Sequence, residues 1–328
     1  MSSEIDNSDD VVARPLRHPW RWVFGGVALA LLLTFIWSLF MAESIQHKIV
    51  VQYLFDQRIL IGMIVTLVVT VVCMLIATIL ATILAIMKLS DNPLLRWLAT
   101  GFIEFFRGTP LLLQIVFWGY LGIIFPNIVL GIPFTDVIFQ SWQTSQVIPA
   151  ILAGIIALSL NEAAYSAEIV RAGILAVDAG QVEAAKSLGM TGGYTMRKIV
   201  LPQAMRVIIP PMGNEFIGML KSTSLLQVIA VAELYTAAST ISAQNLAQIE
   251  LLVVSGFWYL VMTTVLGFPQ RAYAAWQEAD HGHAAARLVP FERPEAFILL
   301  IALLSSLLLH LLLKAFHSRL RVLLEVCE

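Results

Sequence analysis

The chain has 328 residues, of which 59% are hydrophobic and 13% are charged, and its mean hydropathy is +0.84. This balance excludes an ordinary soluble globular domain and predicts an all-α integral membrane protein, which has the lipid bilayer as its solvent. The formal net charge of -2 gives no reason to expect a nucleic-acid partner, and the spacing of Cys73 and Cys327 predicts neither a disulfide nor a metal site.

The N-terminal region predicts a tail and a first membrane-spanning helix. Residues 1–21 are polar and acidic at first and end with three arginines and a histidine, and residues 22–42 are apolar. Positive charge marks the cytoplasmic side of a span, and this apolar run is longer than the core of a cleaved signal peptide. We therefore predict a cytoplasmic tail over 1–21 and an N-terminal span over 22–42.

Three further apolar runs predict spans that alternate in direction. Residues 59–87 are followed directly by Lys88, so this end of the span belongs inside, and residues 97–125 return outward. Residues 126–146 are predicted as an external loop, because no lysine or arginine occurs near them, and 147–170 lead back to the cytoplasm. Pro110, inside the second run, is expected to end or kink a helix because proline lacks an N–H donor.

The segment 181–202, QVEAAKSLGMTGGYTMRKIVLP, is charged and lies between apolar runs. Lysines and arginines are frequent from Arg171 onward, so the positive-inside rule places this segment in the cytoplasm. Gly189 is expected to allow a sharp reversal after a short helix, and Pro202 suits the first turn of the next helix. We call residues 181–202 the coupling segment.

After the coupling segment the chain predicts one interrupted span and one clear span. Residues 204–220 are apolar but contain Pro210-Pro211, which we expect to interrupt the helix as a hinge or a packing device. The polar run 221–224 separates this part from 225–238, and polar backbone at membrane depth must face protein or a water-filled cavity. The last clear span is predicted over 251–268.

The coupling segment carries a fixed spacing of seven residues, which are Glu183, Ala184, Ala185, Gly189, Ile199, Leu201 and Pro202. At these residues the chain resembles the permease subunits of ABC importers, whose cytoplasmic EAA loop has the pattern EAA-x3-G-x9-I-x-LP. The stretches 102–114 and 161–181 resemble the polar amino acid branch of that family. The resemblance covers roughly residues 58–266. It implies a type I-like ABC permease fold over 57–268, with a five-span core and the N-terminal span as an addition.

The resemblance also implies a function. The protein would be the transmembrane subunit of an importer that moves polar amino acids into the cytoplasm by alternating access, and residues 183–189 would dock on a separate ABC ATPase subunit. That partner would bind ATP and magnesium, with no cofactor and no enzymatic activity in this chain. Further implied partners are an extracytoplasmic solute-binding protein and a second permease subunit, identical or homologous. The implied location is the bacterial cytoplasmic (inner) membrane.

Ionisable residues inside predicted spans are costly and are therefore candidates for function. Two groups are candidates for the substrate path, and they are Asn161, Glu162 and Tyr165 in one span and Asn214, Glu215 and Lys221 beside the interrupted span. The latter three would otherwise bond to neighbouring helices or to free backbone carbonyls. Two further carboxylates are predicted to form local ion pairs, Glu168 with Arg171 and Glu104 with Arg107.

A second class of function stays open from the residues alone. An ion-gradient-driven secondary amino acid transporter would use Glu162, Glu168 and Lys221 as proton or ion sites. It would have no need of the coupling segment. A membrane enzyme is disfavoured, because the sequence offers no cluster of metal ligands and no pair of nucleophile and base.

The C-terminal extension over 269–328 departs from the family pattern. It is rich in alanine, arginine, histidine and proline at first and contains a further apolar segment over 297–313. If residues 297–313 crossed the membrane from the inside, the basic residues after them would lie outside, against the positive-inside rule. Three alternatives therefore remain: a poorly anchored extra span, a helix at the membrane interface, or an altered reading frame, which we favour. His281 and His283 lack the neighbouring ligands of a metal site.

Overall fold

The computed structural model describes residues 19–40, 46–131 and 138–280. The predicted tail, apart from its last three residues, lies outside the described residues. So do the apolar segment 297–313 and His281 and His283, so the structure leaves these predictions as they stand.

The chain divides into two compact units, residues 1–48 and 49–328. The helix of the first unit is α1 (Pro19–Phe40), whose 22 residues suffice to cross the hydrocarbon core of a bilayer. Its described side chains are exposed, as expected for a helix that is apolar on all sides and faces lipid. The position of α1 agrees with the N-terminal span predicted over 22–42.

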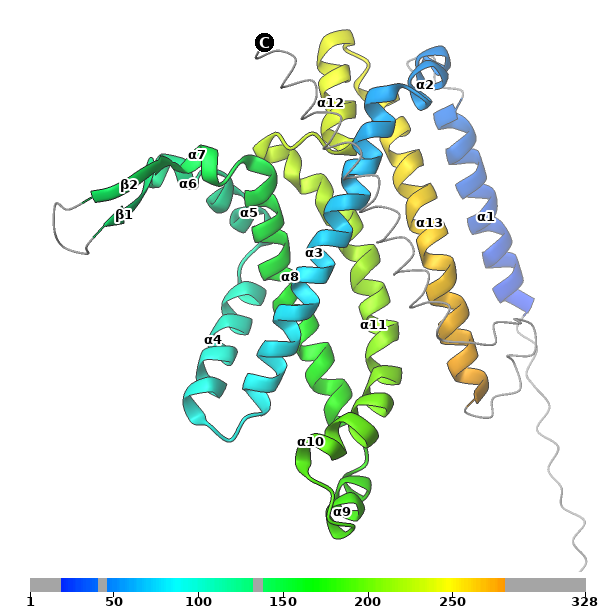
Figure 1. The fold of residues 1–328 in the computed structure, drawn as a ribbon. Coiled ribbons are helices and arrows are strands. Elements are labelled where there is room, and N and C mark those ends of the chain that lie inside the picture. The colour runs from blue at the N-terminus through cyan, green and yellow to red at the C-terminus, as the bar shows by residue number, and fades with distance from the viewer. Residues whose placement is uncertain (1–18, 41–45, 132–137, 281–328) are drawn as a thin grey trace, which may run out of the picture. The chain divides into compact units, whose positions relative to one another are not determined.

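The second unit is a bundle of helices with one small sheet (Figure 1). Its helices in chain order are α2 (His47–Leu54, which begins at the end of the first unit), α3 (Gln57–Leu89), α4 (Pro93–Gly108), α5 (Leu111–Gly119), α6 (Leu121–Ile124), α7 (Thr144–Val147), α8 (Ala150–Leu175), α9 (Ala179–Ser187), α10 (Gly192–Thr195), the π-helix η1 (Met196–Val200), α11 (Leu201–Ser222), the 3₁₀ helix η2 (Thr223–Ile229), α12 (Leu234–Asn245) and α13 (Gln248–Asp280). The strands are β1 (Asn127–Gly131) and β2 (Ile138–Gln143).

The centre of the bundle is the contact between α3 and α8, which pack along much of their lengths. Small residues allow this close approach: Ala77 and Ala81 of α3 are fully buried in one cluster with Ala163 and Ala167 of α8. Asp56 starts α3 by accepting a hydrogen bond from the backbone N–H of the second residue of the helix. The side-chain hydrogen bond from Arg58 lowers the pKa of Asp56.

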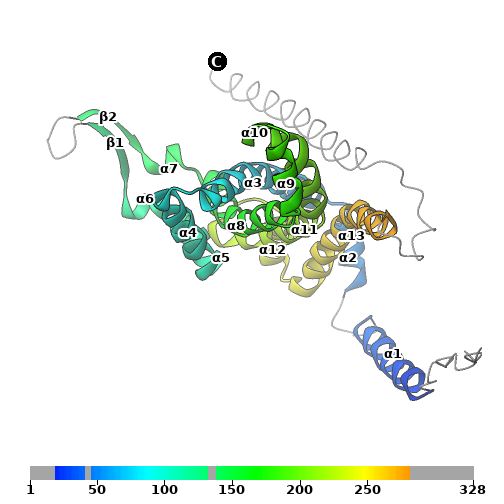
Figure 2. The same cartoon turned by 90° about the horizontal axis from the view of Figure 1, so that it is seen from below.

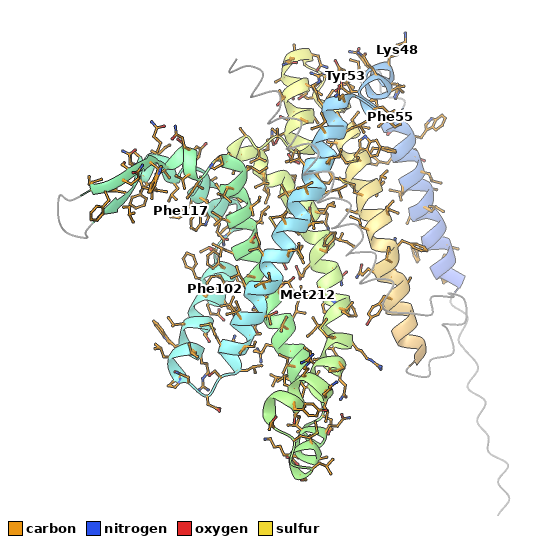
Figure 3. The ribbon with its side chains drawn as sticks, viewed as in Figure 1. Lys48, Tyr53, Phe55, Phe102, Phe117 and Met212 are labelled. Atoms are coloured by element: carbon orange, nitrogen blue, oxygen red, sulfur yellow. The ribbon has the colours of Figure 1, made fainter. Side chains whose placement is uncertain are left out.

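Four buried clusters hold the other helices against this pair. The first joins α3, α5, α8, α11 and η2, and the second joins the start of α3 to α12 and α13. The third packs α4 against α3 and α8, and the fourth packs α11 against α3 and α8. Phe102 of α4 and Met212 of α11 add partly buried side chains to these clusters (Figure 3). The order of the chain therefore places α3 and α8 inside and α4, α5, α12 and α13 around them.

Three helical segments of the described residues are long and apolar enough to cross a membrane by themselves, namely 57–89, 150–175 and 248–273. The helix over 192–229 and α12 make a fourth span if the pair, which is bent by 45°, is counted as one. The remaining predicted span, over 97–125, is divided at Thr109 and Pro110 into α4 and α5. The expected break at Pro110 is therefore confirmed. Each of the two helices is too short to cross the membrane alone.

The predicted interruption at Pro210-Pro211 is wrong, because α11 runs through both prolines. Each proline removes one backbone hydrogen bond, a loss that membrane helices tolerate when neighbouring groups compensate. The helix changes instead in the polar run, where η2 takes over at Thr223 and the left-handed Ala230 (φ 58°) ends it. The last helix also runs further than predicted, since α13 continues beyond Phe268 to Asp280.

The external loop contains the one departure from an all-helical architecture among the described residues. The strands β1 and β2 pair antiparallel, with Asn127 opposite Gln143 and Leu130 opposite Gln140, and the register shifts between Leu130 and Gly131. We predicted an external loop here and made no prediction of strands within it. Figures 1 and 2 show that the hairpin extends sideways from the helices.

Several basic residues gather at one end of the bundle, whereas Lys48 and Arg58 stand at the other end, in α2 and at the start of α3 (Figure 3). The coupling segment, the end of α3 at Lys88 and the end of α8 near Arg171 lie together at one end (Figure 1). The hairpin and α12 lie away from that end. By the positive-inside rule, the end with the coupling segment faces the cytoplasm.

Candidate functional site

The coupling segment is built from a short helix, a glycine turn and a second helical stretch that leads into the membrane. Asp178 precedes α9 and accepts a hydrogen bond from the backbone N–H of Gly180, which caps the N-terminus of the helix. In the view from below, α9 and α10 lie across the ends of α3, α8 and α11 (Figure 2). The segment thus forms the outermost surface of the bundle at its cytoplasmic end.

Gly189 makes the turn after α9 in a left-handed conformation, with φ +74°. The backbone N–H of Gly189 donates to the carbonyl of Lys186 at 2.9 Å, and that of Met190 donates to the carbonyl of Ala185 at 3.1 Å. These bonds satisfy carbonyls at the end of the helix, as in a Schellman-type cap. The reversal predicted at Gly189 is confirmed, and its requirement for glycine follows from the sign of φ.

The residues of α9 divide between an inner and an outer face. Ala185 is buried and fixes the helix to the rest of the segment, whereas Glu183 and Ala184 are exposed. Leu188, directly after the helix, is 82% exposed. An exposed leucine beside a small residue and a carboxylate is suited to contact with another protein, because a small side chain lets a partner approach closely.

The other three residues of the predicted motif lie where the segment returns to the membrane. Ile199 is partly buried in the π-helix η1, Leu201 begins α11, and Pro202 occupies its first turn as predicted. Gln203 ties the two arms together, since its Nε2 donates to the Gln181 side-chain oxygen at 2.6 Å. The arm containing Glu183 and the arm containing Pro202 are therefore joined by a side-chain contact.

A polar cluster compensates for the break between α4 and α5. The Nε2 of Gln114 donates to the carbonyls of Phe106 and Thr109, at 3.0 and 3.1 Å, and to the Thr109 hydroxyl at 2.7 Å. The amide of Asn161, on α8, donates to the same Phe106 carbonyl at 3.0 Å and to Gln114 Oε1 at 3.2 Å. The side chains of Asn161 and Gln114 thus satisfy the Phe106 carbonyl, which Pro110 leaves without a helical partner.

Gln114→Met is expected to destabilise the protein by about 1–3 kcal/mol, because the carbonyls of Phe106 and Thr109 and the amide of Asn161 would lose a buried partner. The side chain keeps its approximate volume, so the effect isolates the hydrogen bonds. Thermal unfolding of the purified protein in detergent measures the loss.

The control for this variant is Leu113→Met on the same turn of α5, where the side chain is 61% exposed, compared with 6% for Gln114. The control should unfold at the wild-type temperature. Equal unfolding temperatures for the two variants would show that the Gln114 bonds contribute nothing measurable.

The structure separates the three candidate path residues of α8. Tyr165 and Asn161 face α4, where the guanidinium of Arg107 lies 5.2 Å from the centre of the Tyr165 ring. Glu162 is buried and accepts a hydrogen bond from the Ser166 hydroxyl at 2.6 Å. It also interacts electrostatically with Glu215 of α11. Glu162 and Glu215 thus stand on two helices that pack together, α8 and α11, within the range of electrostatic interaction.

The remaining candidates on α11 have different surroundings. Asn214 accepts a hydrogen bond from Gln270 Nε2 at 2.7 Å and so contacts α13. Lys221 is exposed in the last turn of α11, where the helix passes into η2. Of the three, Glu215 is the residue whose charge interacts with Glu162.

Glu168 forms ion pairs across the cytoplasmic end of the α3–α8 contact. Its oxygens lie 2.6 Å from Lys88 Nζ and 2.9 Å from Arg171 Nη2. The predicted pair with Arg171 is confirmed, and Lys88 adds a link to α3. The pair predicted between Glu104 and Arg107 is absent from the described residues, because Arg107 lies over the Tyr165 ring instead.

Sequence reasoning missed Glu233, which is the most completely buried carboxylate of the described residues at 0% exposure. It caps α12 by accepting from the backbone N–H groups of Tyr235 and Thr236, at 2.9 and 2.6 Å. The hydroxyl of Tyr259 on α13 donates to it at 2.8 Å, and that of Thr66 on α3 at 3.4 Å. A signal was present in the sequence, since Glu233 stands within the apolar run predicted over 225–238.

Across the part of the chain that the structure describes, no group of three or more histidine, cysteine, aspartate or glutamate residues could hold a metal ion. The single cysteine described, Cys73, is buried and free.

Comparisons with known proteins point to one family. Residues 77–279 match the family model described as "binding-protein-dependent transport system inner membrane component". An arginine transport system permease protein of Corynebacterium glutamicum, ArgU, is 44% identical over 257 residues, which are 78% of this chain and 79% of that protein. A glutamate/aspartate import permease protein of Escherichia coli, GltK, is 35% identical over 207 residues, 62% of this chain and 87% of that protein.

A solved structure described as an amino acid ABC transporter with histidines is also similar. It is 34% identical in sequence, with a TM-score of 0.56, and the match covers 67% of this chain and 94% of that chain.

Proposed function

Since the chain belongs to the family of binding-protein-dependent transport system inner membrane components, we propose that it forms the translocation path of an importer for polar amino acids in a bacterial inner membrane. As a permease subunit of an ABC importer, it is a transport component, and alternating access is the general mechanism of its family. The proposal concerns its solute, its partners and the residues that couple it to them.

The coupling segment is the observation that carries the proposal. It presents Glu183, Ala184 and Leu188 at the cytoplasmic end of the bundle, and the Gly189 turn holds them there. We assign this surface to a separate ATPase subunit, which would bind ATP and magnesium. Movement of α9 would reach the membrane through Gln181 and Gln203, the side-chain link to the start of α11.

The other partners follow from the family and from the direction of transport. A solute-binding protein would deliver the amino acid at the external end, and a second permease subunit, identical or homologous, would complete the path. Alternating access needs two states of the pore whose relative energies the ATPase changes. The broken helices support such a change, because η2 and the left-handed Ala230 lie between α11 and α12.

We propose that Glu162 of α8 and Glu215 of α11, two helices that pack together, attract the cationic groups of the solute. A carboxylate pair between α8 and α11 favours an amino acid with a basic side chain, and the relative most identical among those described above is named for arginine. Lys221, exposed at the end of α11, would favour the solute carboxylate. Asn161, Tyr165 and Asn214 stay candidates for the path, although their side chains contact α4, α5 and α13 in this structure.

Glu215→Gln is expected to lower the uptake of a basic amino acid by roughly ten-fold or more, the equivalent of about 1.4 kcal/mol in binding, because the neutral amide removes one negative charge from the path. Uptake of a labelled amino acid into proteoliposomes that contain the complete transporter measures the change. Glu104→Gln is the matched control, since it removes the same charge from an exposed position on α4. Equal uptake by the two variants would remove Glu215 from the path.

The proposed function as a whole is tested by reconstitution. The chain is co-expressed with its ATPase and solute-binding partners, and uptake of a panel of amino acids is measured with ATP inside the vesicles. We expect uptake that requires ATP and persists when ion gradients are collapsed. Uptake that continues without an ATPase and stops with the gradient would instead support the secondary transporter.

A further inference from the structure

The external hairpin presents apolar side chains that nothing in the second unit covers. Every residue of β2 is exposed, including Phe139 and Trp142, and Leu130 of β1 is exposed as well. An exposed group of large apolar side chains on a protein marks a contact with a partner or with lipid.

The two faces of the hairpin differ. Side chains alternate along a strand, and paired residues share a face, so Ile128, Leu130 and Trp142 lie on one face together with Gln140. We call this the apolar face. The opposite face carries Asn127, Val129, Ser141 and Gln143 and is mostly polar in this region, and beyond the register shift Ile138, which pairs with Gly131, falls on it as well. The hairpin is therefore amphipathic over the region where its register is regular.

Its position and charge indicate which partner the apolar face fits. The strands extend sideways from the bundle, across the direction of α5 and α8, and α6 and α7 connect them directly to the external ends of these helices (Figures 1 and 2). Neither strand contains a charged residue. A ribbon in this orientation runs along a membrane surface, and tryptophan is enriched where membrane and water meet.

We propose that the hairpin lies in the external membrane interface, with the apolar face toward the lipid acyl chains and the Val129 face toward water. The hairpin does not insert more deeply. A two-stranded sheet has two open edges whose N–H and C=O groups need water or lipid headgroups, and the hydrocarbon core supplies neither. The contact would hold the external ends of α5 and α8 at a fixed depth, beside the break at Pro110.

Two neighbouring residues provide a matched test. Leu130 and Val129 are 59% and 47% exposed in the chain by itself, so cysteines at these positions should react at similar rates if only the protein shielded them. The complete transporter is prepared in lipid vesicles with Cys327→Ser as background and the buried Cys73 retained. A membrane-impermeant maleimide is added from the external side, and labelling is normalised to that in sodium dodecyl sulfate.

We expect Leu130→Cys to react several-fold more slowly than Val129→Cys. Equal rates would overturn the proposal, and so would protection of both positions, which would mean that protein covers both faces. Protection of Leu130→Cys that appears only when the solute-binding protein is added would assign the face to that protein instead.

A second measurement covers the case in which the cysteine variants fail to assemble. Brominated lipids quench tryptophan fluorescence on contact, and the contribution of Trp142 is the difference between the wild type and Trp142→Phe. We expect bromine near the headgroups to quench this contribution more strongly than bromine at the acyl-chain ends. No quenching from either depth would contradict a lipid contact.

Discussion

Gly189→Val is expected to abolish ATP-dependent uptake while the protein still inserts into the membrane. Gly189 has φ +74°, a conformation that is strongly unfavourable for a β-branched residue. The left-handed region costs an L-residue about 1–2 kcal/mol, and valine adds crowding at Cβ. The turn would therefore change conformation and displace α9 with Glu183 and Leu188. Uptake into proteoliposomes and capture of the ATPase subunit by the purified permease measure the two consequences.

Two substitutions test whether the backbone of Gly189 is the cause. Asparagine tolerates the left-handed region, so Gly189→Asn should retain much of the activity. Gly193→Val adds the same side chain in the same segment, where φ is not positive and no atom lies within 4 Å of the new Cβ. It should couple normally. Full uptake by Gly189→Val, or equal loss in Gly193→Val, would contradict a role for this turn.

Glu233→Ala is expected to cause the largest loss of stability, several kcal/mol in total. It removes the cap of α12, which consists of the bonds to the N–H groups of Tyr235 and Thr236 and is worth about 0.5–2 kcal/mol, and it leaves the Tyr259 hydroxyl without its acceptor, at about 1–3 kcal/mol. Thermal unfolding in detergent and the yield of assembled protein measure the effect.

Glu233→Gln is the conservative partner of this variant. Glutamine retains one acceptor oxygen and the size of the side chain, so we expect most of the stability to return. Tyr259→Phe removes a single donor from the same carboxylate and should lie between glutamine and wild type. If Glu233→Ala unfolded at the wild-type temperature, the network around Glu233 would be incidental to the fold.

Features that depend on the local chain were accessible from the sequence. The membrane setting followed from composition, and the predicted orientation followed from the position of lysines and arginines along the chain. The reversal at Gly189 and the start of α11 near Pro202 followed from the backbone preferences of glycine and proline. The break at Pro110 was predicted for the same reason.

Local reasoning failed where contacts with other parts of the chain decide the local structure. Pro210 and Pro211 do not interrupt α11, whereas the break predicted in the polar run 221–224 is confirmed at Thr223. The hairpin was missed because its strands are short and one face is mostly polar, so neither gives a strong hydrophobic pattern. The pair expected between Glu104 and Arg107 was wrong because Tyr165, from another helix, competes for the arginine.

The sequence by itself determined that this is a membrane protein with a charged segment between its spans, because hydrophobicity, charge and backbone preference belong to each residue and its neighbours, and its motif indicated the permease family through resemblance. Only the tertiary structure decided which polar groups meet inside the bundle. Asn161 reaches Phe106 across 55 positions of the chain, and Thr66 reaches Glu233 across 167. Such contacts depend on how distant helices pack, and helical periodicity gives the face of each residue but not its partner.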